Sequence, residues 1–219
     1  MDVQHDLRNL VLIREYGLTD YEPIFEKMRE FSEKRAHETT DEFWVLEHNP
    51  VYTLGLNGSE THILNSRDIP VVNVDRGGQV TYHGPGQLII YLLIDIRRKK
   101  MGVRAIVTAM ENAIIEVLRD LGIEAIAKKN APGVYVNGKK IAALGLRIKN
   151  GKSYHGLSLN IDMDLAPFKG INPCGYENLD VTQISLLNTA VSRESIKNNL
   201  VCALKNQLHY SLTENRITT

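Results

Sequence analysis

The stretch QLIIYLLIDI, residues 87–96, decides the fold class of this chain. Its apolar residues alternate too little with polar ones for a strand that has one face in water, so it predicts a strand at the centre of a sheet. Tyr91 and Asp95 interrupt the run, which is far too short to span a bilayer. We therefore expect a domain organised around this strand.

Further strands are predicted on both sides of this stretch. Short apolar runs typical of strands occupy residues 10–14, 43–46, 69–74 and 154–161. Residues 133–136 and 139–148 predict a β-hairpin, because the dipeptide Asn137-Gly138 between them favours a type I′ turn.

Three helices are predicted from apolar residues at helical spacing. The first begins at Thr19, where Glu22 completes a capping box. The second covers residues 103–121 and is ended by Gly122, and the third begins after Ser192 as its N-cap. Hairpins and helices around one sheet indicate an α+β fold, a mixed β-sheet with flanking helices.

The composition is that of an ordinary globular protein, with 43% hydrophobic and 24% charged residues. Lys+Arg and Asp+Glu both number 26, so the net charge gives no indication of nucleic-acid or membrane binding. No repeat or low-complexity linker divides residues 1–219, and we expect a single domain. Residues 1–8 lack the basic start and apolar stretch of a secretory signal, so we expect a soluble, cytoplasmic protein.

The segment RGGQVTYHGPGQ, residues 76–87, is rich in glycine and lies between two apolar strands. Two ordinary turns would explain the glycines. Glycine also lets a backbone approach a ligand closely, and Arg76, Tyr82 and His83 are unusual residues for a plain turn. The segment matches neither a Walker loop nor a dinucleotide-binding fingerprint.

Lys139 and Lys140 are neighbours in a predicted strand, so their side chains point to opposite faces. One lysine is expected in solvent and the other on an apolar face. A lysine on such a face usually extends its ammonium to water. Alternatively, a desolvated ammonium stabilises the anion of a nearby thiol or carboxylate.

Only two cysteines are present, too few for a disulfide scaffold, and their number fits a reducing compartment. Cys202 falls at an apolar helical position, where core packing explains it. Cys174 stands between Pro173 and Gly175 on a predicted tight loop, outside any regular element. Of the two thiols, Cys174 is the candidate nucleophile.

Four segments taken together resemble the lipoyl(octanoyl) transferase family, in that family's order and at its approximate separations: residues 76–87, 138–147, 155–160 and 172–175. The resemblance implies the fold of the biotin and lipoate protein ligase catalytic domain. It implies that Cys174 is the acyl-thioester nucleophile and that Lys140 lowers its pKa. It implies that the substrate contacts Arg76, Gly77, Gly78, Gln79, Val80, Thr81, Tyr82, His83, Ala143, Leu144, Gly145, Gly156, Leu157 and Ser158, with His155 as possible support.

The same resemblance implies an acyltransferase that needs no cofactor and no metal. It would transfer an octanoyl or lipoyl group from acyl carrier protein to a lysine of a lipoyl domain, the first step of endogenous protein lipoylation. The implied acceptors are the lipoyl domains of 2-oxoacid dehydrogenase acyltransferase subunits and the glycine cleavage H protein, with no nucleic acid and no membrane as partners. Acidic carriers could dock on the basic stretch 97–100 and on Lys128, Lys129, Lys149 and Lys152, although charge runs are usually solvated faces.

Two other functions fit the same residues. An ATP-dependent lipoate or biotin protein ligase of this fold would not need Cys174, and a non-catalytic module would bind lipoyl domains without forming an adduct. His83 and His155 are rival bases to Lys140, or structural residues. A metal site made of His48, His83 and His155 has no ligand spacing in its favour.

Overall fold

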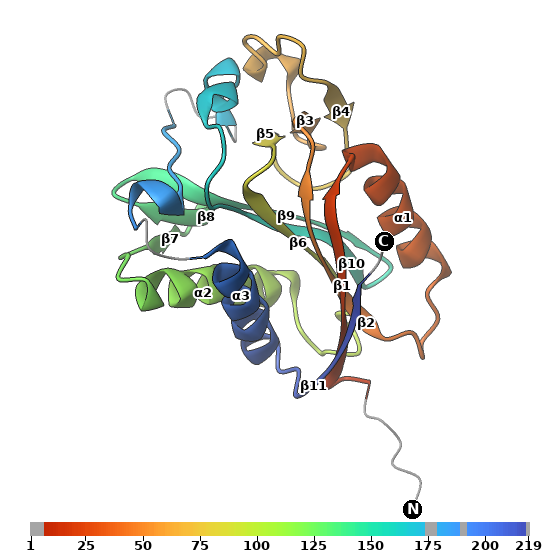
Figure 1. Cartoon of the computed structure of the whole chain (residues 1–219). Coiled ribbons are helices and arrows are strands. Elements are labelled where there is room, and N and C mark those ends of the chain that lie inside the picture. The colour runs from red at the N-terminus through yellow and green to blue at the C-terminus, as the bar shows by residue number, and fades with distance from the viewer. Residues whose placement is uncertain (1–6, 174–178, 189–191, 218–219) are drawn as a thin grey trace, which may run out of the picture.

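The computed structural model describes residues 7–173, 179–188 and 192–217 of the chain. These residues form two β-sheets and three α-helices (Figure 1). The large sheet has eight strands in the order β11-β1-β2-β6-β10-β9-β8-β7. Its strands are β1 (Leu10–Thr19), β2 (Asp41–His48), β6 (Gln87–Leu93), β7 (Ile126–Lys128), β8 (Ala131–Val136), β9 (Lys139–Lys149), β10 (Lys152–Asn160) and β11 (Leu212–Ile217).

The small sheet has three strands in the order β4-β3-β5 and lies at one end of the large sheet (Figure 1). Its strands are β3 (Val51–Leu54), β4 (Val71–Asn73) and β5 (Val80–His83). Because β5 ends only a few residues before β6 begins, the glycine-rich segment passes directly from the small sheet into the centre of the large one.

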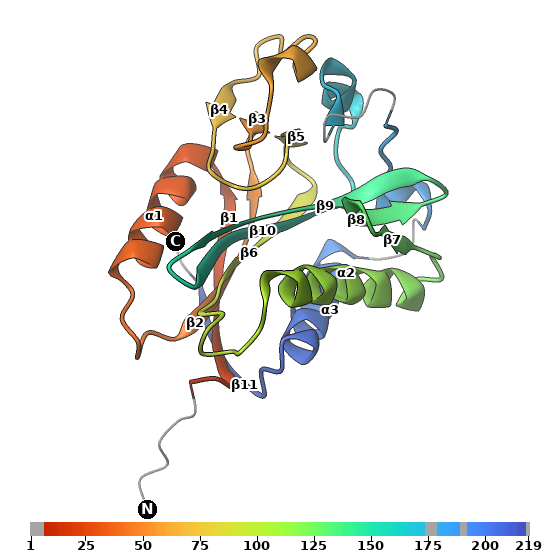
Figure 2. The same cartoon turned by 180° about the vertical axis from the view of Figure 1, so that it is seen from behind.

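The predicted central strand is confirmed. All seven residues of β6 are buried, and β6 pairs antiparallel with β2 on one side and β10 on the other. Helix α1 (Tyr21–Lys34) covers one face of the large sheet, and α2 (Val103–Asp120) and α3 (Arg193–Gln207) cover the opposite face (Figures 1 and 2). Because helices bury both faces, β6 needs apolar residues at almost every position.

The two core clusters that include residues of β6 reflect this layering. Ile106 and Met110 of α2 pack in the larger cluster with even-numbered β6 residues such as Ile90. Ile24 and Met28 of α1 pack in the second cluster with odd-numbered β6 residues, Ile89, Tyr91 and Leu93. Among the described residues, none of the helices combines the length and apolarity required to span a membrane.

Several predicted boundaries are confirmed. Asn137 and Gly138 both have positive φ, 49° and 83°, as a type I′ turn between β8 and β9 requires. Gly122 has a φ of 74° directly after α2, where few other residues are tolerated. The Ser192 hydroxyl accepts a hydrogen bond from the Ser195 N–H at 3.1 Å and caps α3.

Three expectations are wrong. Thr19 is the last residue of β1 rather than a helix cap, and α1 begins at Tyr21 without a side-chain cap. Only Val71–Asn73 of the stretch 69–74 is a strand, and it lies at the edge of the small sheet with Val71 39% exposed. Cys202 is exposed, because α3 turns Leu200, Ala203 and Leu204 inward and leaves position 202 on the outer side.

Candidate active site

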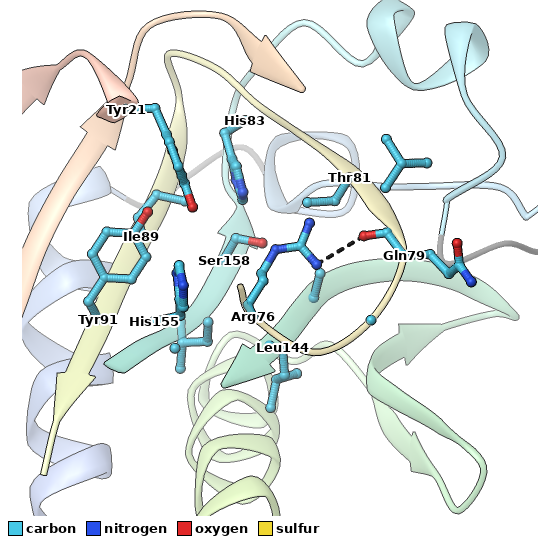
Figure 3. A pocket seen from close by; sticks show the side chains of 16 residues that line it. Tyr21, Arg76, Gln79, Thr81, His83, Ile89, Tyr91, Leu144, His155 and Ser158 are labelled. Atoms are coloured by element: carbon cyan, nitrogen blue, oxygen red, sulfur yellow. Dashed lines mark hydrogen bonds between the residues drawn. The ribbon is translucent and has the colours of Figure 1, made fainter. Parts of the chain in front are cut away.

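A pocket between the two sheets gathers residues from three of the four predicted segments (Figure 3). It is lined mostly by apolar residues with a few polar groups, a composition typical of small-molecule sites. The glycine-rich segment contributes Arg76, residues 78–81 and His83, β9 contributes residues 143–145, and β10 contributes residues 155–158.

Two residues of the predicted set do not line this pocket. The Gly77 N–H donates to the Leu146 carbonyl at 3.0 Å. This bond joins the glycine-rich segment to the part of β9 that lies beyond its pairing with β8. Tyr82 faces the core of the small sheet, where its ring packs against Tyr52 and Phe168 at centroid distances of 5.5 Å. Tyr82 is therefore a packing residue in this structure.

Three residues that line the pocket were not predicted from the sequence as site residues: Tyr21, Ile89 and Tyr91. Tyr21 falls within the first predicted helix, and Ile89 is one apolar residue among many. Tyr91 carried a usable signal, because a tyrosine in the middle of a fully apolar central strand requires a partner for its hydroxyl.

The floor of the pocket is made of small residues in neighbouring strands. Ser158 pairs with Ile89 of β6 and with Ala143 of β9, and Gly156 pairs with Tyr91 and with Gly145. A Cβ at Gly156 would lie 2.1 Å from the Ile90 carbonyl oxygen, so only glycine fits at this position. These small residues leave a trough along the face of the sheet.

Arg76 holds the roof of the pocket in place. Its guanidinium is buried and donates to the Gln79 carbonyl at 2.9 Å, and to the Thr53 carbonyl and hydroxyl at 2.8 and 2.7 Å (Figure 3). A Cβ at Gly145 would approach Arg76 Cδ to 3.0 Å, so the alkyl stem of the arginine lies close on β9. Arg76 therefore organises the glycine-rich segment over the trough.

His83 and His155 line the pocket, and His48 packs against Tyr21 and Tyr91 of its lining; all three histidines are buried. Burial lowers the pKa of His83 to about 3 and that of His48 to about 4. Burial also lowers the pKa of His155, although its bond to Asp75 opposes this effect. No group of three or more His, Cys, Asp or Glu side chains in the described part of the chain is placed to hold a metal ion.

The tautomer of His83 follows from its neighbours. The Gln87 side-chain NH₂ donates to the Tyr82 carbonyl at 3.2 Å and to Asn160 Oδ1 at 2.9 Å, which leaves Gln87 Oε1 as an acceptor. His83 Nδ1 lies 2.6 Å from that oxygen and must donate to it. His83 Nε2 therefore carries the lone pair.

Lys140 is buried, at 4% exposure, whereas the side chain of Lys139 is 53% exposed. This arrangement confirms that the two lysines differ, and Lys140 does not extend to water. Its Nζ donates to the Pro132 carbonyl at 3.0 Å, across the hairpin. A Cβ at Gly133 would lie 2.5 Å from Lys140 Cε, so a glycine in β8 makes room for this side chain. The register of β8 and β9 shifts next to Lys140, an irregularity that redirects a side chain.

The predicted nucleophile Cys174 lies outside the described residues. Pro173 and Val181 line the same small cavity as Lys140. The Lys140 N–H donates to the Asp180 carbonyl at 2.8 Å, and the Thr182 N–H donates to the Lys140 carbonyl at 2.9 Å. The two described segments nearest to position 174 on either side therefore both reach the lysine.

The cavity at Lys140 adjoins the main pocket. Thr81, Ala143 and Ser158 line both. A ligand chain could therefore lie in the trough with its reactive end toward Lys140. This geometry places a buried lysine in a cavity next to a largely apolar trough, and it suits the transfer of an acyl chain.

The cations proposed for docking are partly used inside the protein. Arg98 donates to Asp41 at 2.5 Å, and Lys99 Nζ donates to backbone carbonyls of Arg8 and His209. Lys149 pairs with Glu33 at 3.0 Å, and Lys152 donates to the Arg35 carbonyl at 2.6 Å. These contacts give those four residues structural roles.

Comparison with known proteins agrees with this geometry. Residues 20–205 match the model of the lipoyl protein ligase A/B catalytic domain. The chain is 48% identical over 213 residues to a Vibrio atlanticus protein named octanoyltransferase, covering 97% of each chain. The chain therefore belongs to the lipoyl protein ligase A/B catalytic domain family.

Solved structures share the fold at low sequence identity. A putative lipoate protein ligase from T. acidophilum, Ta0514, superimposes with a TM-score of 0.75 at 15% identity, covering 96% of this chain and 89% of that one. Biotin protein ligase from Aquifex aeolicus, in complex with biotin and ATP, gives a TM-score of 0.56 at 13% identity, covering 91% and 70%. The expected α+β fold of the biotin and lipoate protein ligases is confirmed.

Proposed function

We propose that this protein is an octanoyltransferase that carries an octanoyl group from acyl carrier protein to a lysine of a lipoyl domain, through a thioester on Cys174. The observation that carries the proposal is the buried Lys140, which shares a cavity with Pro173 and Val181. The name of the Vibrio atlanticus relative supports the octanoyl group as the cargo.

The first half-reaction needs a thiolate. A free cysteine has a pKa of about 8.5, so only a few per cent of it is ionised at neutral pH. The Lys140 ammonium, in a site of low dielectric, favours the thiolate by direct attraction. The thiolate attacks the donor carbonyl, a new C–S bond forms to Cys174, and the bond to the carrier's thiol breaks. Lys140 gives a proton to the departing thiolate and becomes neutral.

The second half-reaction restores the starting state. The neutral amine of the acceptor lysine attacks the thioester on Cys174, and an amide bond forms as the C–S bond breaks. The amine loses its extra proton to Lys140, which becomes an ammonium again beside the released Cys174 thiolate. Protons therefore balance between the two halves, and the exchange of a thioester for an amide proceeds without ATP.

The acyl chain would occupy the trough, and the carriers would dock outside it. The apolar chain lies against Ile89 and the small floor residues, with its carbonyl at the Lys140 end. We assign the donor to acyl carrier protein and the acceptors to lipoyl domains of 2-oxoacid dehydrogenase subunits and of glycine cleavage H protein, and we place the reaction in the cytoplasm. Arg97, Lys100, Lys128 and Lys129 remain the candidate docking cations.

Intact mass measurement tests this function. The protein is incubated with octanoyl-acyl carrier protein without ATP, and we expect a mass gain of one octanoyl group that is absent in Cys174→Ala. An adduct that forms only with free octanoate and ATP would favour the ligase instead. Carrier binding without any adduct would favour a non-catalytic module.

A further inference from the structure

The trough has a direction that the strand register defines. The cavity at Lys140 reaches Gln87 of β6 and Asn160 of β10, which pair with each other. The main pocket continues along alternate residues of the same two strands, through Ile89 and Ser158 to Tyr91 and Gly156. Asn160 and Gly156 are four positions apart in β10, a span of about 13 Å at the usual rise of a strand. The trough therefore runs away from Lys140 along one face of the sheet.

Two rings stand at the far end of this trough, Tyr91 and His155. They are 4% and 1% exposed, and their centroids lie 6.0 Å apart in an edge-to-face arrangement. In Figure 3 they lie on the left of the pocket, and Gln79 and Thr81 lie on the right. The small floor residues end at Gly156, so the trough changes there from small side chains to large rings.

Hydrogen bonds hold the tyrosine in position. His48 Nδ1 lies 3.1 Å from the Thr19 carbonyl and must donate to it, so the neutral ring presents the lone pair of Nε2. The Tyr91 hydroxyl lies 2.7 Å from His48 Nε2 and donates to it. A displaced Tyr91 would lose this bond inside the protein, where no water replaces it.

His155 is held in place although its backbone conformation is uncommon and its ring is only partly hydrogen-bonded. Its φ is 59°, a conformation uncommon for residues other than glycine, and it lies inside β10. His155 Nε2 donates to Asp75 Oδ1 at 3.1 Å, whereas its buried Nδ1 has no hydrogen-bond partner among the residues that the structure describes. The Phe25 ring of α1 packs on it at 5.4 Å. Strained and unsatisfied buried groups of this kind concentrate at functional positions.

We propose that Tyr91 and His155 form the end wall of the acyl trough and set the longest acyl chain that the protein transfers. This inference rests on the octanoyl transfer proposed above. A chain longer than the trough must displace a hydrogen-bonded ring, so the transfer rate falls steeply beyond the limit. If flexible apolar side chains closed the trough instead, the transfer rate would decline gradually with acyl chain length.

The wild-type protein provides the first test. Acyl carrier protein loaded with hexanoyl, octanoyl, decanoyl, dodecanoyl or tetradecanoyl groups is offered with a lipoyl domain, and kcat/KM is measured for each. We expect kcat/KM to fall by about 10-fold or more at the first chain beyond the limit. A gradual or absent decline through tetradecanoyl overturns the wall. Absence of any octanoyl transfer contradicts the proposed function itself.

Two variants test the rings directly. His155→Gly removes the imidazole at a position whose φ suits glycine. Tyr91→Val replaces the other ring by a short side chain and keeps a strand-forming residue. We expect each to raise the decanoyl-to-octanoyl ratio of kcat/KM by about 10-fold. Tyr52→Val is the matched control, because Tyr52 is a buried tyrosine of the small sheet that lines no part of the trough.

The kcat/KM ratios of these variants either support or overturn the end wall. A raised ratio in the two trough variants, with the ratio of Tyr52→Val at the wild-type value, supports the end wall. An unchanged ratio in both trough variants, with octanoyl transfer retained, overturns it. If neither trough variant folds by circular dichroism, the wild-type chain-length series alone decides.

Discussion

Lys140 Nζ lies 3.0 Å from the carbonyl oxygen of Pro132, so a lysine in one strand of the hairpin donates to the backbone of the other. This bond orients an ammonium that burial would otherwise disfavour. An ammonium carries three N–H donors, so this bond is compatible with a second one to a thiolate. This geometry supports the electrostatic role proposed for Lys140, a role not proposed for its exposed neighbour Lys139.

Replacing Lys140 tests this role. We expect Lys140→Met to raise the pKa of the Cys174 thiol by about one unit or more and to lower kcat by about 100-fold or more, because both the attraction and the proton transfer are lost. The pH dependence of iodoacetamide alkylation reports the thiol pKa. The measurement is made in a Cys202→Ser background, because Cys202 is exposed and would react as well.

Lys139→Met is the matched control for this experiment. It removes the same charge from the adjacent position, where the side chain is 53% exposed. We expect wild-type alkylation and transfer from it. An identical alkylation profile in Lys140→Met and Lys139→Met would remove Lys140 from the mechanism.

Gly133→Ala should disturb the same lysine from the opposite strand. The new Cβ would lie 2.5 Å from Lys140 Cε and 2.8 Å from the Ala142 carbonyl, at a φ of 140°. We expect a loss of roughly 1–3 kcal/mol in the free energy of unfolding, from strain, together with a higher alkylation pKa.

The control for this prediction is Gly138→Ala. Gly138 also has positive φ, 83°, but a Cβ there would meet nothing within 4 Å. We expect it to lower the stability measured by urea unfolding and to leave the thiol pKa unchanged. A thiol pKa that shifts equally in both variants would mean that general loosening of the hairpin, and not contact with Lys140, is responsible.

The buried histidines predict how stability depends on pH. Burial lowers the pKa of His48 from 6.5 to about 4, so between these values the unfolded chain binds a proton that the folded protein does not. Stability is therefore full above about pH 6.5 and falls as the pH drops toward 4, by on the order of 3 kcal/mol for His48 alone. His83, with a pKa of about 3, adds to the same trend.

His48→Gln checks this prediction, since glutamine does not titrate and its oxygen can accept from Tyr91. Urea unfolding at about pH 7.5 and about pH 5 gives the stability difference for each protein. We expect a smaller difference in the variant than in the wild type. Equal differences would mean that His48 is not held neutral by burial.

Local sequence signals were sufficient for much of the fold. The apolar run of β6, the Asn137-Gly138 turn and the Gly122 helix end were predicted correctly, because each depends on nearby residues and intrinsic backbone preference. The capping box at Thr19 was wrong, because pairing with β2 extends β1 through that residue. Tertiary pairing outweighed a local preference there.

For the site, the sequence motifs identified the segments that contribute residues but not the pocket that these segments enclose. Residues 76–83, 143–145 and 155–158 were chosen as separate motifs, and most of them line one pocket. Tyr21 and Tyr91 were missed as lining residues, because a tyrosine in an apolar pattern looks the same whether it borders core or cavity.

The sequence by itself determined the family, the central strand and the distinct character of the Lys139-Lys140 pair, since these follow from residue types at short separations. Only the tertiary structure decided that Lys140 meets Pro132, that Val181 reaches the same cavity, and that Tyr91 and His155 end the trough. The reason is physical. Strand register and helix packing bring together residues far apart in the chain, and the burial that creates their chemistry depends on all the elements at once.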